Sequence, residues 1–192
     1  MLTLIKLGHR DLERYYPLME TDFDSEELLS RLAIHKGMLN GSIELLALRD
    51  TDSLMDAGYA LMLTKNLYGY VDMKYMAVMP WFRGRGLGVQ LMRELNRRYA
   101  DSQGIIAELT EFPDPDPDRL RKLRKFFARF GYEEIPCDCT IRGVKDNILL
   151  KPMQGSADIA PVIQRVLPDF YARFLSANAL WGMMEIKRAE KE

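Results

Sequence analysis

The feature that most limits how this chain can fold is a glycine turn between an apolar run and an amphipathic helical repeat. Residues 83–88 read Arg-Gly-Arg-Gly-Leu-Gly, soon after an apolar run at 70–79. Leu87, Leu91 and Leu95 then recur at helical spacing. A glycine turn at a helix start leaves several backbone N–H groups uncovered at the positive end of the helix dipole. The order strand, glycine turn, helix therefore predicts an anion-binding site.

The spacing within the turn separates it from two familiar nucleotide-binding loops. No Gly-Lys-Ser/Thr follows the glycines, as a Walker loop requires, and the GxGxxG spacing of a dinucleotide-binding turn is missing. What remains is the pattern R-x-x-G-x-G. Taken alone, this hexapeptide is equally compatible with a flexible surface turn or a basic patch, because glycines also interrupt strands and helices for geometric reasons. The flanking strand and helix favour the functional interpretation.

Apolar periodicity and turn residues predict the other elements of the chain. The strands are expected at 2–7, 43–48, 57–64, 70–79, 105–109, 132–135 and 148–150. Helices are expected over 10–39 in two pieces, from residue 87, over 120–130 and over 158–175. Asp24 or Ser25 is the expected cap of the second helical piece, and Leu28, Leu29 and Leu32 are its expected apolar face. Asp118, after a loop with prolines at 113, 115 and 117, is the expected cap of the helix at 120–130.

Charge and cysteine content argue against several classes of function. The chain carries 27 Lys and Arg against 28 Asp and Glu, a formal net charge of −1, so it has no overall attraction to nucleic acid. Cys137 and Cys139 are too few for a disulfide framework and lack the second pair of a zinc site. No secretory leader and no apolar run of about 18 residues is recognised. We therefore expect a cytoplasmic protein with no metal, membrane or nucleic-acid partner.

With a second motif, FFARFGY at 126–132, the glycine turn resembles the GNAT (Gcn5-related) N-acetyltransferase superfamily. The phosphate-binding signature of that family is Arg or Gln, two residues, Gly, one residue, then Gly or Ala. The resemblance implies an α/β fold with a mixed, mostly antiparallel central sheet flanked by helices. The helical pattern at 158–175 lies outside the resemblance and predicts a C-terminal helical extension. We therefore expect the acetyltransferase domain at residues 1–152 and the extension at 153–192.

The resemblance also implies an activity: direct transfer of an acetyl group from acetyl-CoA to a primary amine of a small molecule or peptide. The chain is then an enzyme. Its C-terminal helical segment, outside the resemblance, could pack either on the core or on a second subunit of a homodimer. The Val78 N–H would meet the thioester carbonyl. The residues expected to bind acetyl-CoA are Ala77, Val78, Arg83, Gly84, Arg85, Gly86, Leu87, Gly88 and Phe127.

An attacking amine must lose a proton, so a general base is needed, either directly or through water. Glu108 is the first candidate because alternation along its strand would allow it to line a cleft, and Glu111 is a weaker one. The alternative for Glu108 is an ordinary strand carboxylate that faces solvent or pairs with an arginine.

Many members of the family carry a tyrosine four residues before the glycine of the second motif, as an acid for the departing thiolate. Phe127 stands at that position here. Water, Tyr132 or Tyr75 could protonate the thiolate instead, or the domain could bind CoA in a regulatory role without turnover. A third interpretation is RNA or 3′-phosphate binding by the basic residues at 119–129, whose simpler explanation is a solvated helix face.

Overall fold

The structure is a computed structural model, and it describes residues 1–65, 68–111, 116, 118–141, 143–155, 162–172 and 184–188. By the contacts among its residues, the chain forms two compact units. Unit 1 comprises Met1–Lys65 and Val71–Asp101, and unit 2 comprises Asn66–Tyr70 and Ser102–Glu192. The glycine turn therefore belongs to unit 1, and the candidate base Glu108 belongs to unit 2.

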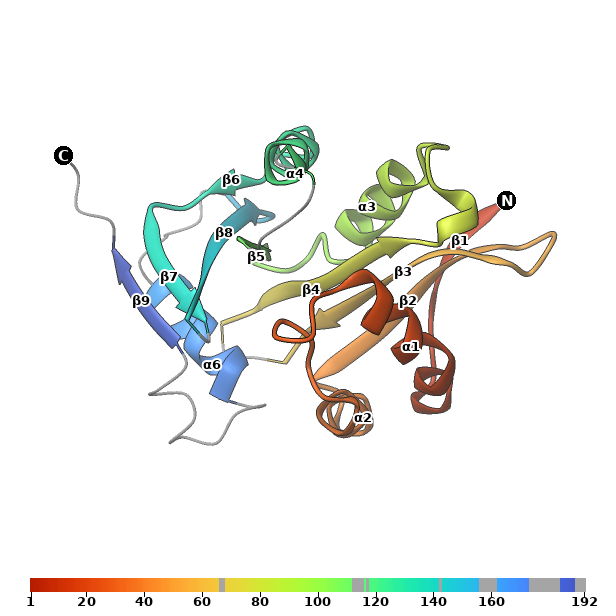
Figure 1. Ribbon diagram of the computed structural model, residues 1–192, viewed down its shortest axis with the longest axis horizontal. Helices are drawn as coiled ribbons and strands as arrows, with labels where there is room; N and C mark the ends of the chain where they lie inside the picture. The colour runs from red at the N-terminus through yellow and green to blue at the C-terminus, as the bar shows by residue number, and fades with distance from the viewer. Residues whose placement is uncertain are drawn as a thin grey trace. The chain divides into compact units, whose positions relative to one another are not determined.

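Unit 1 is built on antiparallel strands that pair in chain order. They are β1 (Leu2–Lys6), β2 (Ile43–Asp50), β3 (Asp56–Leu63) and β4 (Tyr70–Val78). Figure 1 shows α1 (Leu12–Asp22) and α2 (Arg31–Asn40) on one side of these strands and α3 (Leu87–Arg98) on the other. Because helices cover both faces, β3 is buried along its whole length. The short 3₁₀ helix η1 (His9–Asp11) precedes α1, and a second one, η2 (Pro80–Phe82), precedes the glycine turn.

The second helix begins later than the sequence predicts. The expected cap at Asp24 or Ser25 is wrong: α2 starts after Ser30, whose hydroxyl accepts the Ala33 N–H at 3.3 Å. Leu32, expected on the apolar face, is 62% exposed. The other two residues of that face, Leu28 and Leu29, are buried ahead of the helix. The sequence therefore predicts a capping side chain before this helix but not the residue at which the helix begins.

Unit 2 contains further strands, which pair antiparallel in the order β5, β8, β7, β9. They are β5 (Gly104–Thr110), β7 (Cys137–Ile141), β8 (Val144–Pro152) and β9 (Met184–Arg188), with the short β6 (Glu133–Glu134) also on β8. The helices are α4 (Arg119–Ala128), the π-helical η3 (Val162–Val166) and α6 (Leu167–Ala172). In Figure 1, α4 and α6 lie on opposite sides of β8.

Two strands of unit 2 were not anticipated. β7 and β9 pair with each other, with Cys139 opposite Ile186.

Of the helix predicted at 158–175, only the central part is described, as η3 and α6. The rest of that helix lies outside the described residues, and so does most of the loop at 113–117. Asp118 precedes α4 as predicted, but its side chain makes no cap and instead accepts the Arg121 Nε–H at 3.0 Å.

The predicted fold class is confirmed, because mostly antiparallel strands flanked by helices make up the described chain, with α6 in the C-terminal part. The division into an acetyltransferase domain at 1–152 and an extension at 153–192 stays a prediction.

Glu44 joins three elements of unit 1. Its carboxylate accepts hydrogen bonds from Lys6 of β1 at 2.8 Å, from Arg98 at the end of α3 at 2.9 Å, and from the Tyr99 hydroxyl at 2.7 Å. Burial raises the pKa of Glu44, but these three donors outweigh it and leave the pKa below its ordinary value. The carboxylate form therefore stabilises the folded state.

We expect this network to make unit 1 sensitive to acid. Because the folded-state pKa of Glu44 is lowered, its contribution is present above the unfolded value and is lost as pH falls below it. Glu44→Gln should reduce the free energy of unfolding by about 2 kcal/mol at pH 7, and the difference from the parent should shrink below about pH 4. Urea unfolding at several pH values measures this. Glu94→Gln is the control, since Glu94 pairs with Arg97 on its own helix; an equal effect there would contradict the assignment.

Candidate functional site

The glycine turn of unit 1 is exposed and leads directly into α3. Gly84 and Gly86 both have a φ of +75°, a left-handed conformation that strains any residue with a side chain. A Cβ added at either position would meet nothing within 4 Å. Gly86 is the N-cap of α3, and its carbonyl accepts the Val89 N–H at 3.0 Å. The exposed glycines therefore lie directly before the start of α3, where the helix dipole and free N–H groups favour an anion.

The predicted acetyl-CoA residues of unit 1 form two neighbouring segments. In the turn, Arg83 to Gly86 are exposed, and Leu87 and Gly88 are half-buried. Ala77 and Val78 lie at the end of β4 and are also half-buried. α3 has no acidic residue in its first turn to repel an anion.

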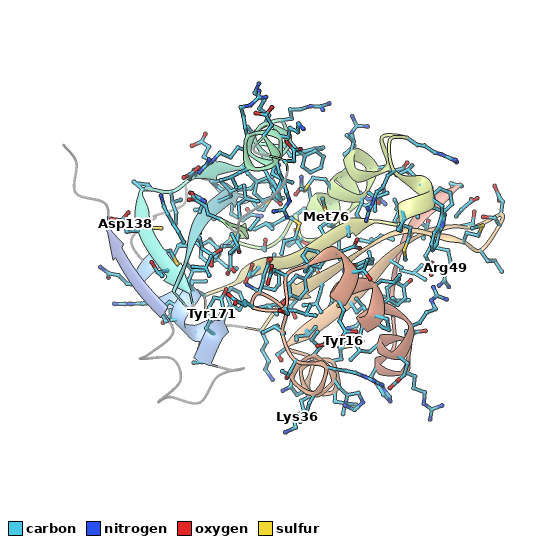
Figure 2. The ribbon with its side chains drawn as sticks, in the orientation of Figure 1. Tyr16, Lys36, Arg49, Met76, Asp138 and Tyr171 are labelled. Atoms are coloured by element: carbon cyan, nitrogen blue, oxygen red, sulfur yellow. The ribbon has the colours of Figure 1, made fainter. Side chains whose placement is uncertain are left out.

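β4 becomes more accessible toward its end. Its first residues are buried, whereas Met76, Ala77 and Val78 are half-buried, and Figure 2 shows Met76 on this part of the strand. The Met79 N–H donates to the Ala57 carbonyl of β3 at 3.0 Å. Because N–H groups alternate sides along a strand, the Val78 N–H points away from β3. It is therefore not used in the pairing of β3 with β4, as the role predicted for it requires.

Gly58, which the sequence analysis did not single out, brings three elements of unit 1 close together. It lies on β3 opposite Val78 of β4. A Cβ at Gly58 would lie 2.8 Å from the Ala77 carbonyl oxygen and 3.2 Å from Leu91 of α3. Only glycine permits this close approach of β3 to β4 and α3.

The two arginines of the turn have different surroundings. Arg83 donates from Nη2 to Asp22 Oδ1 at 2.5 Å and from Nε to the Val78 carbonyl at 3.1 Å. The Arg85 guanidinium lies over the Phe82 ring, 5.7 Å from its centroid, and Arg85 is exposed. Of the two side chains, Arg85 is thus the one better placed to meet a phosphate directly.

Glu108, the candidate base of unit 2, is buried and does not face solvent. It lies on β5 opposite Ile148 and is 8% exposed. The hydroxyl of Tyr171, on α6, donates to Glu108 Oε2. Figure 2 shows Tyr171 on α6, so a residue of the C-terminal segment covers this carboxylate.

Glu111, the weaker candidate, lies among cations. Its Oε1 accepts the Asn147 Nδ2–H at 2.9 Å and lies 3.8 Å from Arg124 and 3.7 Å from Lys145. Its carboxylate is therefore already engaged by an amide and two nearby cations. The contacts of Glu111 are therefore those of a structural residue.

Phe127 lies in an aromatic cluster of unit 2 and is 7% exposed. Its ring centroid is 5.7 Å from that of Phe126 and 5.2 Å from that of Tyr132. Burial raises the pKa of Tyr132, which keeps its hydroxyl protonated. The Tyr75 hydroxyl, the other acid considered, accepts the Leu29 N–H at 2.7 Å and donates to the Glu27 carbonyl at 3.0 Å, so its proton already has an acceptor.

Several cations of α4 are paired with nearby acids. The pairs are Arg121 with Asp118, Lys122 with Asp116, and Arg124 with Glu134. This favours the solvated-face interpretation of the basic residues at 119–129.

Within the described part of the chain, no group of three or more His, Cys, Asp or Glu residues could hold a metal ion. No described helix is long and apolar enough to cross a membrane.

Comparison with known proteins decides the family. The model of the acetyltransferase (GNAT) domain matches residues 42–134, which include the glycine turn and the second motif. This chain contains a GNAT acetyltransferase domain. No curated protein sequence matches the chain significantly.

Solved GNAT structures share the fold of this chain. A GNAT-family protein from Bacteroides thetaiotaomicron has a TM-score of 0.66 at 14% identity, over 85% of this chain and 93% of that one. One from Desulfovibrio desulfuricans has a TM-score of 0.60 at 16% identity, over 80% and 100%. The spermidine/spermine N-acetyltransferase SpeG from Vibrio cholerae has a TM-score of 0.57 at 14% identity, over 78% and 94%. At these identities the likeness concerns the fold alone.

Proposed function

We propose that this GNAT domain is an N-acetyltransferase that uses acetyl-CoA as the acetyl donor and a primary amine as the acceptor. The observation that carries the proposal is the turn at 83–88: two left-handed glycines, open space above them, and a helix start with no acidic residue in its first turn. This arrangement fits a diphosphate, because backbone N–H groups and the helix dipole both favour negative charge there. The exposed Arg85 adds a positive charge.

The transfer needs two contributions from the protein. The Val78 N–H, which points away from β3, stabilises the negative charge on the thioester oxygen as the amine attacks. Glu108 accepts the proton of the attacking amine, directly or through water. A C–N bond forms to the acetyl carbon, the C–S bond breaks, and the thiolate of CoA leaves and is protonated from water.

The acceptor is proposed only as a class, namely a small-molecule or peptide amine. SpeG, which shares the fold, is a spermidine/spermine N-acetyltransferase. This supports amines as the class to test first, with polyamines and peptide N-termini in the first panel. A cytoplasmic location and a homodimer stay predictions from the sequence.

Two measurements test the proposed function. Titration calorimetry with acetyl-CoA should show one site with a dissociation constant of about 1 mM or tighter, in the ordinary range for an enzyme substrate. Release of the CoA thiol, followed with a colorimetric thiol reagent over the amine panel, should exceed the rate without acceptor. Absence of acetyl-CoA binding at millimolar concentration would refute the assignment.

A second candidate is a CoA-binding domain without turnover. Two observations favour it: Phe127 stands where a tyrosine acid is common in the family, and Glu108 is buried beneath Tyr171. It predicts acetyl-CoA binding with no thiol release above background for any acceptor in the panel. Thiol release with any single amine would exclude it.

A further inference from the structure

We propose that Asp22 is a positioning residue for the acetyl-CoA turn, acting through Arg83. The inference rests on the proposed function, because it concerns the same turn. Asp22, Tyr59, Arg83 and the Val78 carbonyl are linked by hydrogen bonds, and we call this set the Asp22 clip. All four residues belong to unit 1.

The clip joins residues far apart in the chain. Asp22 Oδ1 accepts from Arg83 Nη2 at 2.5 Å, and Asp22 Oδ2 accepts from the Tyr59 hydroxyl at 2.8 Å. The Arg83 Nε–H donates to the Val78 carbonyl at 3.1 Å. Burial and the neighbouring Asp22 carboxylate raise the pKa of Tyr59, so its hydroxyl stays a donor. One guanidinium therefore ties the turn to the end of β4 and to the end of α1.

The place of Asp22 in its helix indicates that its carboxylate is held for these contacts. Asp22 is the last residue of α1, where the negative end of the helix dipole disfavours an acid. Its side chain is also only 10% exposed. An acid in such a position needs compensation, and the Arg83 cation and the Tyr59 hydroxyl supply it.

The clip acts on both backbone elements proposed to touch acetyl-CoA. Arg83 is the first residue of the turn, so fixing its side chain restricts the conformations open to Gly84 and Gly86, which lack side chains of their own. Val78 presents its carbonyl to Arg83 on the side facing away from β3, the side on which its N–H also lies. The clip thus anchors Val78, whose N–H is proposed to meet the thioester oxygen.

The competing interpretation is that Arg83 binds a phosphate directly, as its place in the motif suggests. The two interpretations predict opposite effects of Asp22. If Arg83 were a phosphate ligand, removing the Asp22 charge would release its guanidinium and tighten CoA binding. If Arg83 positions the turn, removing that charge loosens the turn and weakens binding.

The experiment is calorimetry with CoA on Asp22→Asn, Arg83→Gln and the double variant. If the loosened turn is competent about a tenth of the time, Asp22→Asn lowers the affinity about 10-fold. Arg83→Gln should lower it at least as much, and the double variant no further than Arg83→Gln alone, because both changes break the same clip. Tyr59→Phe should give a smaller loss in the same direction. Glu20→Gln removes a charge from the exposed side of α1 and should leave the affinity unchanged.

Each outcome decides between the interpretations. Unchanged or tighter binding by Asp22→Asn, with the parent protein binding CoA, overturns the clip and leaves the proposed function standing. Failure of the parent protein to bind CoA overturns the proposed function and this inference with it. A urea unfolding curve of each variant accompanies the titration, and if Asp22→Asn does not fold, Tyr59→Phe decides: unchanged affinity there overturns the clip.

Discussion

Replacing Gly86 by glutamate is expected to lower the affinity for acetyl-CoA by at least about 100-fold, or about 2.7 kcal/mol. The φ of Gly86 is +75°, so the new residue is strained, and its carboxylate lies at the helix start proposed to hold the diphosphate. The new carboxylate would therefore repel the negatively charged diphosphate. Calorimetric titration with acetyl-CoA measures the loss, and an unchanged affinity would remove the turn from the binding site.

Gly143→Glu is the matched control for this substitution. Gly143 has a φ of +78°, and a Cβ added there would also meet nothing within 4 Å. The two variants therefore add the same side chain in similar backbone conformations. Gly143→Glu should bind acetyl-CoA as the parent does, so a comparable loss in both would indicate a general effect of strain or charge.

Glu108→Gln is expected to lower kcat by about 10²- to 10⁴-fold with little change in acetyl-CoA affinity. Glutamine keeps the size of the side chain and its hydrogen bond from Tyr171 but has no basic carboxylate. The rate of CoA thiol release at saturating amine measures the effect. A loss confined to acetyl-CoA affinity would show that Glu108 supports the fold of the site and takes no part in proton transfer.

Glu111→Gln provides the comparison for Glu108. Glu111 already accepts from Asn147 and lies near Arg124 and Lys145, so its loss should change kcat by less than about 3-fold. If Glu111→Gln reduced kcat as much as Glu108→Gln, the assignment of the base to β5 would be wrong.

The parts of the fold that depend on local sequence could be predicted. The strands, the glycine turn and α3 follow from apolar periodicity and from glycines, and the GNAT resemblance rests on the same residues. Contacts between residues far apart in the chain could not be predicted. Arg83 meets Asp22, 61 residues earlier, and Tyr171 meets Glu108, 63 residues earlier. The apolar periodicity of a sequence does not indicate which distant side chains will meet.

Two further differences have physical causes that single residues do not reveal. Ser30, Ser25 and Asp24 are all acceptable helix caps. In the structure Ser30 caps α2, whereas Asp24 Oδ1 accepts the Glu26 N–H at 3.1 Å ahead of the helix. The expected contact of Arg83 with acetyl-CoA stays a prediction, but its motif does not reveal that its guanidinium also donates to Asp22 at the end of α1 and to the Val78 carbonyl of β4. Catalytic roles for Glu108 and for the residues of the turn stay predictions.

The pairing of β9 with β7 has a practical consequence for shortened versions of this protein. The GNAT domain match ends at residue 134, before either strand begins. A chain cut after residue 155 would retain β7 but lose β9, so a row of backbone donors and acceptors on β7 would face water. Exposed edges of this kind recruit other strands, and such a fragment would tend to self-associate or precipitate.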